Sequence, residues 1–498
     1  MPEDKNKTDL DERKMRLKRL ENIKKSGSNP YPEKFDKQQT LADAKTLKEG
    51  TEVKTAGRIL TIRDMGKIIF CHLQDFSGKL QVVLKEDEVG KEKLKWFLDN
   101  FDLGDFVGVA GEIFTTKKGE ISILVKKYDF LGKALLPLPE KWHGLKDAEL
   151  IYRQRYLDLV ANEESMARFK LRSEIVKALR EFYWGRGFIE VETPILCNTA
   201  SGAIAKPFVT HYNALDLDVY LRIAPEIYLK ECIIGGLEKV FEIGRCFRNE
   251  GMDPSHLQDF TMVEHYAAYW NYEDNMKFTE ELICHLLDKF FGGRKIKIKD
   301  RKGELKEVDF MPPWPRVSLR ELIKKDSGID IDRAVTAEEL AKEIKKKKIE
   351  IEGAERLSRG GLIDSLYKQV SRSKLIQPTF LIQHPLDLSP LARRSDDNPA
   401  VVDRFQLIVN TWELCNAYSE LVDPLDQKER FEKQSVAKDA GDSEAHGKDD
   451  EFVEALEHGA PPISGWGLGV DRLVALLTQQ DNLRDVVLFP LMRPQNKE

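Results

Sequence analysis

Apolar and polar residues alternate in short runs from Thr51 to about Gly132, the pattern of β-strands that bury one face. Five such runs are separated by turn sequences such as FSG and KKG: VKTAGRIL, KIIFCHLQD, KLQVVL, DFVGVAGEIF and EISILVKKYDF. They predict a closed barrel of the oligonucleotide-binding kind, an OB-fold. Phe70, Phe76 and Gln81 suit the stacking and reading of single-stranded RNA bases. An aromatic ring here also suits the barrel core, and the pattern does not separate the two interpretations.

A basic helix is predicted before the barrel. The stretch RKMRLKRLENIKK (13–25) holds seven Lys or Arg and one acidic residue, and Leu17, Leu20 and Ile23 share one helical stripe. This helix is expected either to dock through its apolar stripe or to contact a nucleic acid through its charges. Residues 1–50 therefore form a basic N-terminal helical extension in our prediction.

The second half of the chain mixes helical and strand patterns. The proline-rich segment ALLPLPEKWHGLKDAEL predicts a linker. A long helix then runs to the glycines at 185 and 187, and Pro194 ends the short strand that follows. The charged stretch around 325–372 indicates a helical surface insertion, and AKDAGDSEAHGKDDEF indicates a mobile loop. The predicted divisions are 1–50, 51–133 (barrel), 134–163 (linker) and 164–498.

The stretch FEIGRCFRNEGMDPSHLQDFTMVEHY (241–266) predicts two β-strands joined by a charged loop. Arg248 and Glu250 lie at the shoulder of this loop, where a solvated ion pair is the ordinary interpretation. Because side chains alternate along a strand, one face of the second strand carries these residues: Phe260, Met262, Glu264 and Tyr266. A carboxylate and a phenol make this face a poor core and a candidate binding surface.

The composition narrows the class of protein. The 498 residues carry a net charge of −6, which argues against a surface coated in positive charge. The six cysteines have no C-x-x-C spacing, so no cysteine-based zinc site is expected. No apolar run reaches the roughly 18 residues of a membrane helix, and no apolar signal segment opens the chain. We expect a soluble cytoplasmic protein without a membrane span.

Three ordered stretches resemble motifs one, two and three of class II aminoacyl-tRNA synthetases: GFIEVETPIL (187–196), FRNE (247–250) with DFTMVEHY, and GWGLGVDRL (465–473). Other stretches resemble the lysyl-tRNA synthetase family: RLKRLENIKKSGSNPYP, LPEKWHGL, RYLDL, LRIAPEIYLK, HPLDLSPLARR and NAYSELVDP. The resemblance implies an α+β fold in which a class II antiparallel sheet flanked by helices follows the five-stranded OB-fold barrel. It also implies ATP-dependent ligation of L-lysine to tRNA(Lys) through a lysyl-adenylate.

The family pattern implies that these residues bind ATP: Arg248, Glu250, His256, Phe260, Glu413 and Arg472. Arg248 and Arg472 are the implied catalytic residues, with Arg248 bridging the substrate carboxylate and the α-phosphate. A carboxylate nucleophile is already ionised, so the reaction needs alignment and neutralised phosphate charge and no general base. A planar guanidinium, which can pair with two oxygens or stack on a base, suits both needs.

A lysine pocket has to pair two ammonium groups in a partly dry site, and this requires carboxylates. By resemblance, the lysine-binding residues are Gly202, Glu226, Arg248, Glu264, Tyr266, Asn416 and Glu420. Glu226 and the backbone at Gly202 are implied at the α-amino group, and the others, Arg248 apart, at or near the ε-ammonium. Taken singly, Glu226 also suits an ordinary helix start, and Glu420 a surface position.

Magnesium is the implied cofactor, held in the family by carboxylates of an RFxLxxxxxE segment. Glu413 matches one of them, whereas Gln406 stands where lysyl enzymes carry a second glutamate, so one charge is missing. A homodimer through motif one is also implied. In the barrel, the implied anticodon-binding residues are Arg63, Phe70, Gln81 and Glu120.

Other functions stay open on the sequence alone. An aspartyl or asparaginyl ligase shares the barrel and the class II layout, but its pocket needs basic residues where Glu264 and Glu420 stand. A paralogue that attaches lysine to protein generally lacks the barrel. A regulatory RNA-binding protein without catalysis is expected to have lost Arg248 or Arg472, and both are present.

Overall fold

The computed structural model describes residues 3–139, 145, 147–199, 205–300, 303–439 and 449–495. The chain divides into two compact units, Met1–Lys146 and Asp147–Glu498. The predicted site residue Gly202 lies outside the described residues, as do 140–144 of the predicted linker and 440–448 of the predicted loop.

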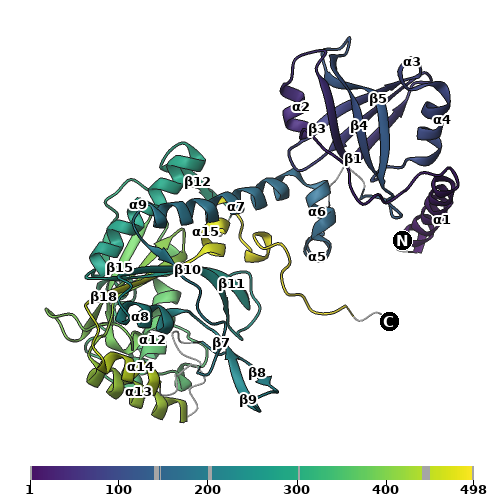
Figure 1. Cartoon of the computed structure of the whole chain (residues 1–498). Helices are drawn as coiled ribbons and strands as arrows, with labels where there is room; N and C mark the ends of the chain where they lie inside the picture. The colour runs from purple at the N-terminus through teal and green to yellow at the C-terminus, as the bar shows by residue number, and fades with distance from the viewer. Residues whose placement is uncertain are drawn as a thin grey trace. The chain divides into compact units, whose positions relative to one another are not determined.

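The first unit is built on a closed five-stranded barrel with strand order β1-β2-β3-β5-β4 (Figure 1). Its strands are β1 (Glu52–Asp64), β2 (Ile68–Gln74), β3 (Lys79–Lys85), β4 (Phe106–Thr115) and β5 (Ile121–Gly132). Its short helices are α2 (Leu41–Thr46), α3 (Glu86–Val89) and α4 (Lys91–Asn100). Alternate residues of β2, Ile69, Cys71 and Leu73, are fully buried in the barrel core. This architecture confirms the predicted barrel.

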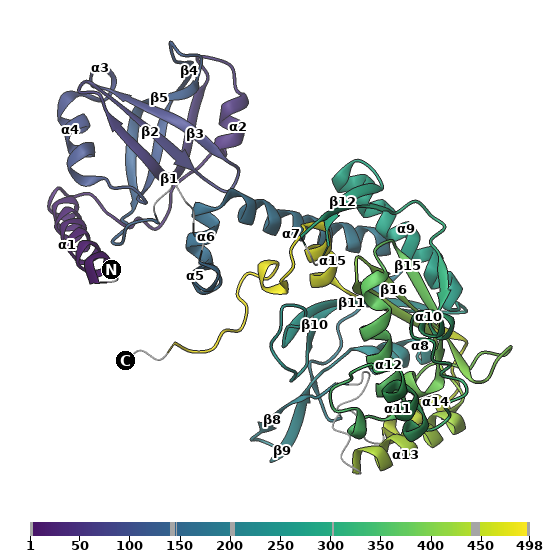
Figure 2. The ribbon, with the colours of Figure 1, turned by 180° about the vertical axis from the view of Figure 1, so that it is seen from behind.

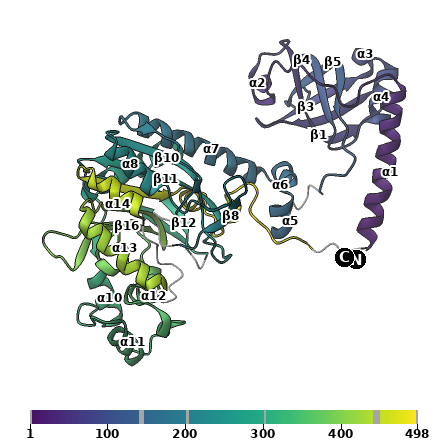
Figure 3. The same cartoon turned by 60° about the horizontal axis from the view of Figure 1, so that its bottom comes forward.

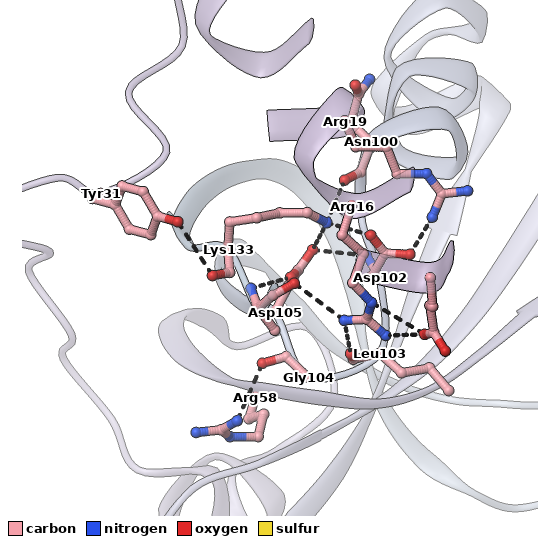
Figure 4. A network of polar contacts seen from close by, with 12 residues as sticks. Arg16, Arg19, Tyr31, Arg58, Asn100, Asp102, Leu103, Gly104, Asp105 and Lys133 are labelled. Carbon is pink, nitrogen blue, oxygen red and sulfur yellow. Dashed lines mark hydrogen bonds and ion pairs between the residues drawn. The ribbon is translucent and has the colours of Figure 1, made fainter. Parts of the chain in front are cut away.

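Helix α1 (Glu3–Lys25) docks on the barrel through a buried arginine (Figure 4). Arg16 is only 2 % exposed and donates hydrogen bonds to the carbonyl oxygens of Leu103 (3.0 Å) and Ala134 (3.2 Å). Ile23 of the predicted apolar stripe is fully buried in the barrel core. The docking half of the prediction for this helix is therefore confirmed, and nucleic-acid contact by its charges stays a prediction.

The same network ties down the chain that leaves the barrel (Figure 4). The ammonium of Lys133 is fully buried, 2.8 Å from Asp105 Oδ2 and also paired with Asp102, which in turn pairs with Arg19 of α1. Asp105 Oδ1 accepts a hydrogen bond from the Ala134 amide. A buried cation is costly unless it is paired, so these contacts fix α1 and the end of β5 relative to each other.

The second unit is built on an eight-stranded sheet with order β14-β15-β16-β17-β18-β11-β10-β6. Its strands are β6 (Ile189–Glu190), β10 (Lys239–Phe247), β11 (Asp259–Ala268), β14 (Arg316–Ser318), β15 (Thr379–Pro385), β16 (Val401–Val409), β17 (Trp412–Ser419) and β18 (Ile463–Gly469). Neighbours are antiparallel except for β14 with β15 and β10 with β6. This sheet and its helices confirm the predicted α+β fold class.

One face of the sheet is covered by three helices: α7 (Glu163–Trp184), α9 (Tyr272–Phe291) and α15 (Val470–Leu477). Their apolar residues share one core with inward-facing strand residues such as Val263 and Leu468. Helix α7 ends where the sequence predicts, and Gly187 just beyond it adopts a φ of 76°, which favours glycine. The opposite face of the sheet is left for a cavity.

Further elements complete this unit. They are α5 (Ala148–Arg153), α6 (Arg155–Ala161), β7 (Leu196–Cys197), β8 (Phe208–Tyr212), β9 (Leu217–Leu221), α8 (Glu226–Ile234), β12 (Lys295–Lys299), β13 (Leu305–Asp309), α13 (Pro424–Asp439) and α14 (Asp450–Glu457). Strands β7, β9 and β8 form a small separate sheet, and β12 pairs with β13.

The region predicted as a surface insertion packs, together with the helix that leads into it, against β15 and the edge strand β14 (Figure 2). Helix α10 (Leu319–Ser327) begins before the predicted insertion and runs into it, and α11 (Ala337–Lys346) and α12 (Arg359–Val370) lie within it (Figure 3). Apolar residues of these helices, including Ile323, Leu340 and Leu366, are fully buried in a cluster that also holds Leu381 of β15. The insertion is thus helical, with an apolar core beneath its charged surface.

None of the helices in the described part of the chain is long and apolar enough to span a membrane. The cytoplasmic location stays a prediction.

Candidate active site

A cavity of about 330 Å³ opens on the face of the eight-stranded sheet opposite the helical core. Ten of the predicted site residues line it: Glu226, Arg248, Glu250, His256, Phe260, Glu264, Tyr266, Glu413, Asn416 and Arg472. These residues come from segments as far apart as α8 and α15, so only the folded sheet brings them together. Glu420 and Gln406 are not among the described residues that line it.

Strand β11 supplies the floor of the cavity by simple alternation. Phe260, Met262, Glu264 and Tyr266 all line the cavity, whereas Val263, next to Glu264, and Ala267, next to Tyr266, are buried in the core. The predicted face of this strand is therefore the one that meets the cavity.

The glycines of β18 make room for these side chains. Strand β18 lies between β11 and β17, with Gly465 opposite Tyr266 on one side and Tyr418 on the other. A Cβ atom on Gly467 would lie 3.2 Å from the Met262 methyl group and 3.3 Å from Glu264 Cγ. Side chains from the neighbouring strands thus lean over the bare backbone, which is a reason for glycine at these positions.

Glu264 is the most perturbed acid of the cavity. It is 5 % exposed, and no basic side chain of the described residues forms an ion pair with it. Burial and, after it, the nearby charge of Glu226 raise the pKa of Glu264 to about 8. Such a carboxyl is protonated at neutral pH and ionises when a cation enters beside it.

Glu226 begins helix α8 and lies at the cavity wall with two partners. The Tyr418 hydroxyl donates a hydrogen bond to Glu226 Oε1 (2.7 Å), and Lys230 Nζ lies 2.6 Å from the same oxygen. Lys230 also pairs with Glu420 Oε2 at 2.6 Å. Glu420 is thus held behind the cavity wall by a lysine of the protein.

Two arginines dominate the other end of the cavity. The guanidinium of Arg248 lies over the Phe260 ring, 5.1 Å from its centroid, and Arg248 Nε is buried with no hydrogen-bond partner among the described residues. Arg472 Nη1 donates a hydrogen bond to the carbonyl oxygen of Glu413 (3.2 Å). Half-buried guanidinium groups, one with an unused buried donor, are suited to an anion such as phosphate or carboxylate.

Glu413 is the carboxylate at this end of the cavity. Burial raises its pKa, but Arg472, Arg372 and Arg404 outweigh burial and hold the pKa below its ordinary value. Glu413 is therefore ionised at neutral pH and can offer oxygen ligands to a hard cation.

Gln406 is engaged within the protein. Its Oε1 lies 3.2 Å from Nε2 of His384, a buried histidine whose pKa is lowered to about 3, chiefly by burial. A neutral His384 can donate this hydrogen bond. Gln406 is not among the described residues that line the cavity, and its predicted place in the metal site, with one charge missing, stays a prediction.

The predicted anticodon-binding residues gather on the outer face of the barrel. Arg63 of β1 lies opposite Phe70 of β2, and Gln81 Nε2 donates a hydrogen bond to Glu120 Oε2 (2.9 Å). Phe70 is half-buried and lies on the face of β2 opposite the core residues, so the core interpretation of this ring is wrong. His72 from the same face lies 3.2 Å from Glu120 Oε1 and is an addition to the predicted set.

Sequence families agree with this geometry. Residues 147–493 match the family model of class II tRNA synthetases (D, K and N), and residues 53–131 match that of the OB-fold nucleic acid binding domain. A lysine–tRNA ligase of Thermosipho africanus is 47 % identical over 491 residues, which cover 97 % of this chain and 96 % of the relative. This chain belongs to the class II lysine–tRNA ligase family.

Other members of the family are similar over most of this ligase. The lysine–tRNA ligase of Aquifex aeolicus is 50 % identical over 446 residues, covering 90 % of this chain and 74 % of the relative. That of Thermotoga maritima is 46 % identical over 497 residues, covering 98 % and 97 %. The family prediction is confirmed, and an aspartyl or asparaginyl ligase is not supported by these relatives.

Arg404, Tyr418 and Asp471 also line the cavity and were missed by the sequence prediction. Arg404 donates hydrogen bonds to Asn416 Oδ1 (2.8 Å) and to Ser389 Oγ (2.7 Å), so it orients the predicted Asn416. Asp471 Oδ2 accepts a hydrogen bond from the Thr261 amide (2.8 Å) and so ties α15 to β11. Tyr418 could have been predicted from the sequence, because alternate residues of a strand lie on one face and Tyr418 is two residues after Asn416.

Proposed function

We propose that this ligase joins L-lysine to tRNA(Lys) in two steps. A carboxylate oxygen of lysine attacks the α-phosphorus of ATP, forming lysyl-adenylate and releasing pyrophosphate. A hydroxyl at the tRNA 3′ end then attacks the activated carbonyl carbon, and AMP leaves. The observation that carries the proposal is one cavity with the carboxylates of Glu226 and Glu264 at one end and the guanidinium groups of Arg248 and Arg472 at the other.

Arg248 has the properties that the first step needs. The nucleophile is already anionic, so the main barriers are charge repulsion from the phosphates and misalignment. A guanidinium whose position is fixed against Phe260 can hold the lysine carboxylate beside the α-phosphate and stabilise the charge that builds up there. Glu250, His256 and Phe260 are assigned to the nucleotide, with Arg472 meeting it from α15.

Lysine specificity follows from the acids of the cavity. Glu226 and Glu264 line it together with Tyr266 and Asn416, and each carboxylate matches one ammonium group of the substrate. Burial makes an unpaired charge costly. An amino acid with an uncharged side chain would leave one carboxylate of the cavity without its partner, and it should therefore bind more weakly than lysine. An acidic amino acid would face like charge here, which favours lysine over aspartate as the substrate.

Magnesium fits the phosphate end of the cavity. Among the described residues, Glu413 is the ionised cavity carboxylate held at this end by arginines, and no group of three or more acidic, His or Cys residues forms a separate metal site. One carboxylate with phosphate oxygens and water is an ordinary ligand set for this cation. When bound, the ion neutralises phosphate charge, and Glu413 is the residue that would hold it.

The outer face of the barrel is assigned to the anticodon. Arg63, Phe70, Gln81 and Glu120 combine a cation, a ring and amide and carboxylate edges on one side of the barrel. Single-stranded bases are bound by such combinations of stacking and hydrogen bonding.

A homodimer through motif one is part of the proposal. Apolar side chains are exposed at the end of α7 and along motif one: Trp184 (53 %), Ile189 (49 %), Ile195 (45 %) and Leu196 (56 %). The adjoining groove along α7 is lined by Phe169, Val176, Leu488 and Phe489. Exposed apolar patches of this kind mark protein interfaces. Light scattering of the purified protein tests the oligomeric state directly.

Two assays test the function. Lysine, and not aspartate or asparagine, should drive exchange of labelled pyrophosphate into ATP, and the activated lysine should pass to tRNA(Lys). Exchange driven by aspartate would overturn the lysine assignment. Adenylate formation without transfer to tRNA would favour an enzyme that attaches lysine to another acceptor.

A further inference from the structure

A lysine of the protein is buried beside the proposed lysine pocket. Lys230 lies one helical turn after Glu226 on α8 and is 1 % exposed. Its ammonium bridges two carboxylates, at 2.6 Å from Glu226 Oε1 and 2.6 Å from Glu420 Oε2. Of these, Glu226 faces the cavity and Glu420 does not.

Aromatic rings surround the same ammonium. Lys230 Nζ lies 5.5 Å from the ring centroid of Phe452, 5.8 Å from that of Tyr418 and 5.9 Å from that of Tyr266. Tyr418 and Tyr266 also line the cavity. Burial lowers the pKa of Lys230, but Glu226 and Glu420 outweigh burial and raise the pKa above its ordinary value, so the bridge carries a positive charge.

Burial raises the pKa of Glu420 well above its ordinary value, and Lys230 counteracts this rise. The formal charges of this region match those of the substrate when Lys230 is counted. Glu226, Glu264 and Glu420 supply three carboxylates, and Lys230 supplies one ammonium, which leaves two net negative charges when all are ionised. Free lysine carries two ammonium groups, and its carboxylate is assigned to Arg248. A third uncompensated carboxylate in a buried site would be costly and would favour protonation.

We propose that Lys230 is a positioning residue for substrate recognition. Its ammonium fixes the Glu226 carboxylate at the cavity wall and compensates Glu420, so that the pocket presents two negative charges to a substrate with two ammonium groups. This role rests on the proposed lysine specificity. It differs from a purely structural role because it ties Lys230 to lysine binding and to its pH dependence.

The test compares charge-removing and charge-keeping variants in the full-length enzyme. Lys230→Met removes the ammonium at similar volume, Lys230→Gln keeps hydrogen-bond donors without charge, and Lys230→Arg keeps the charge. Lys239→Met is the matched control, because Lys239 lies over the Trp270 ring (5.2 Å) and outside the cavity lining. Lysine-dependent pyrophosphate exchange is measured with lysine and ATP varied in turn across pH, beside thermal melting.

We expect Lys230→Met to raise the KM for lysine by roughly tenfold or more, with the KM for ATP within about twofold. The pH at which lysine binding improves should move upward, because the pKa values of Glu226 and Glu420 rise when the positive charge of Lys230 is removed. Lys230→Arg should largely restore both. An unchanged lysine KM and pH profile in Lys230→Met would overturn the proposal.

Two further comparisons keep the outcome clear. If Lys230→Met does not fold, Lys230→Gln and Lys230→Arg decide: equal lysine KM values in the two would overturn the role of the charge, and a higher value in Lys230→Gln would support it. If the unaltered enzyme shows no lysine-dependent exchange, the proposed function itself is wrong. If the unaltered enzyme shows normal lysine-dependent exchange and the Lys230 variants keep its lysine KM and pH profile, only the positioning role is wrong.

Discussion

Gly465 lies directly beneath the carboxyl group of Glu420, and a Cβ atom at this position would collide with Glu420 Oε1 and with the Tyr266 ring. Glu420 is the acid that Lys230 holds behind the cavity, and Tyr266 lines the cavity itself. A single methyl group on β18 would therefore disturb the proposed lysine pocket and leave the nucleotide end untouched.

Gly465→Ala should raise the KM for lysine while the KM for ATP stays close to that of the unaltered enzyme. Overpacking of this kind costs about 1–3 kcal/mol, so the melting temperature should also fall. Gly293→Ala is the control, because a Cβ atom there meets no other atom within 4 Å. Equal effects on lysine and ATP would contradict the assignment of the two ends.

Lysine binding should depend on pH through Glu264. The pKa of this carboxyl is raised to about 8, so it is mostly protonated at neutral pH and ionised at higher pH. The ionised form pairs with an ammonium group, so the KM for lysine should fall as pH rises from about 6.5 to about 8.5.

Glu264→Gln removes this ionisation. The variant should bind lysine more weakly at high pH and lose the part of the pH dependence that Glu264 supplies. Glu273→Gln, on an acid paired with Arg316 and half exposed, serves as the control. If the KM for lysine in Glu264→Gln equals that of the unaltered enzyme at every pH, Glu264 does not bind lysine.

Arg248→Ala should slow adenylate formation by on the order of 10²-fold or more, as loss of a preorganised donor to the transition state does. Arg245→Ala is its partner control, since Arg245 lies near the end of β10, three residues before Arg248, pairs with Asp259 at 3.3 Å and does not line the cavity. Pyrophosphate exchange measures both. A nearly normal rate in Arg248→Ala would show that the guanidinium takes no part in the step.

Phe70→Ala should weaken tRNA use without affecting adenylate formation. Stacking of one base on an aromatic ring contributes about 1–3 kcal/mol, so the KM for tRNA(Lys) should rise by roughly tenfold or more. Phe106→Ala is the control, because this barrel ring is 40 % exposed and already covered by the Arg58 guanidinium at 4.3 Å. An unchanged KM for tRNA(Lys) in Phe70→Ala would contradict the assignment of this ring to the anticodon.

The local patterns of the sequence predicted the five barrel strands, helices α1 and α7, and the pair of strands β10 and β11. Alternation predicts β2 and β11 because a strand with one buried face has period two, and this property needs no knowledge of the partner strands. The same alternation placed Phe260, Glu264 and Tyr266 together before any fold was known. The charge of the predicted pocket was also visible, since three acids occur at its predicted positions.

The tertiary structure decided which of these side chains reach the cavity. Strand β18 inserts between β11 and β17, which are far from each other in the chain, and only this pairing sets Glu420 over Gly465. The sequence also could not show that Lys230 is the partner of Glu420, because this ion pair joins helix α8 to the end of a strand almost two hundred residues further along the chain. Long-range contacts depend on the order of strands in the sheet, and no local period encodes that order.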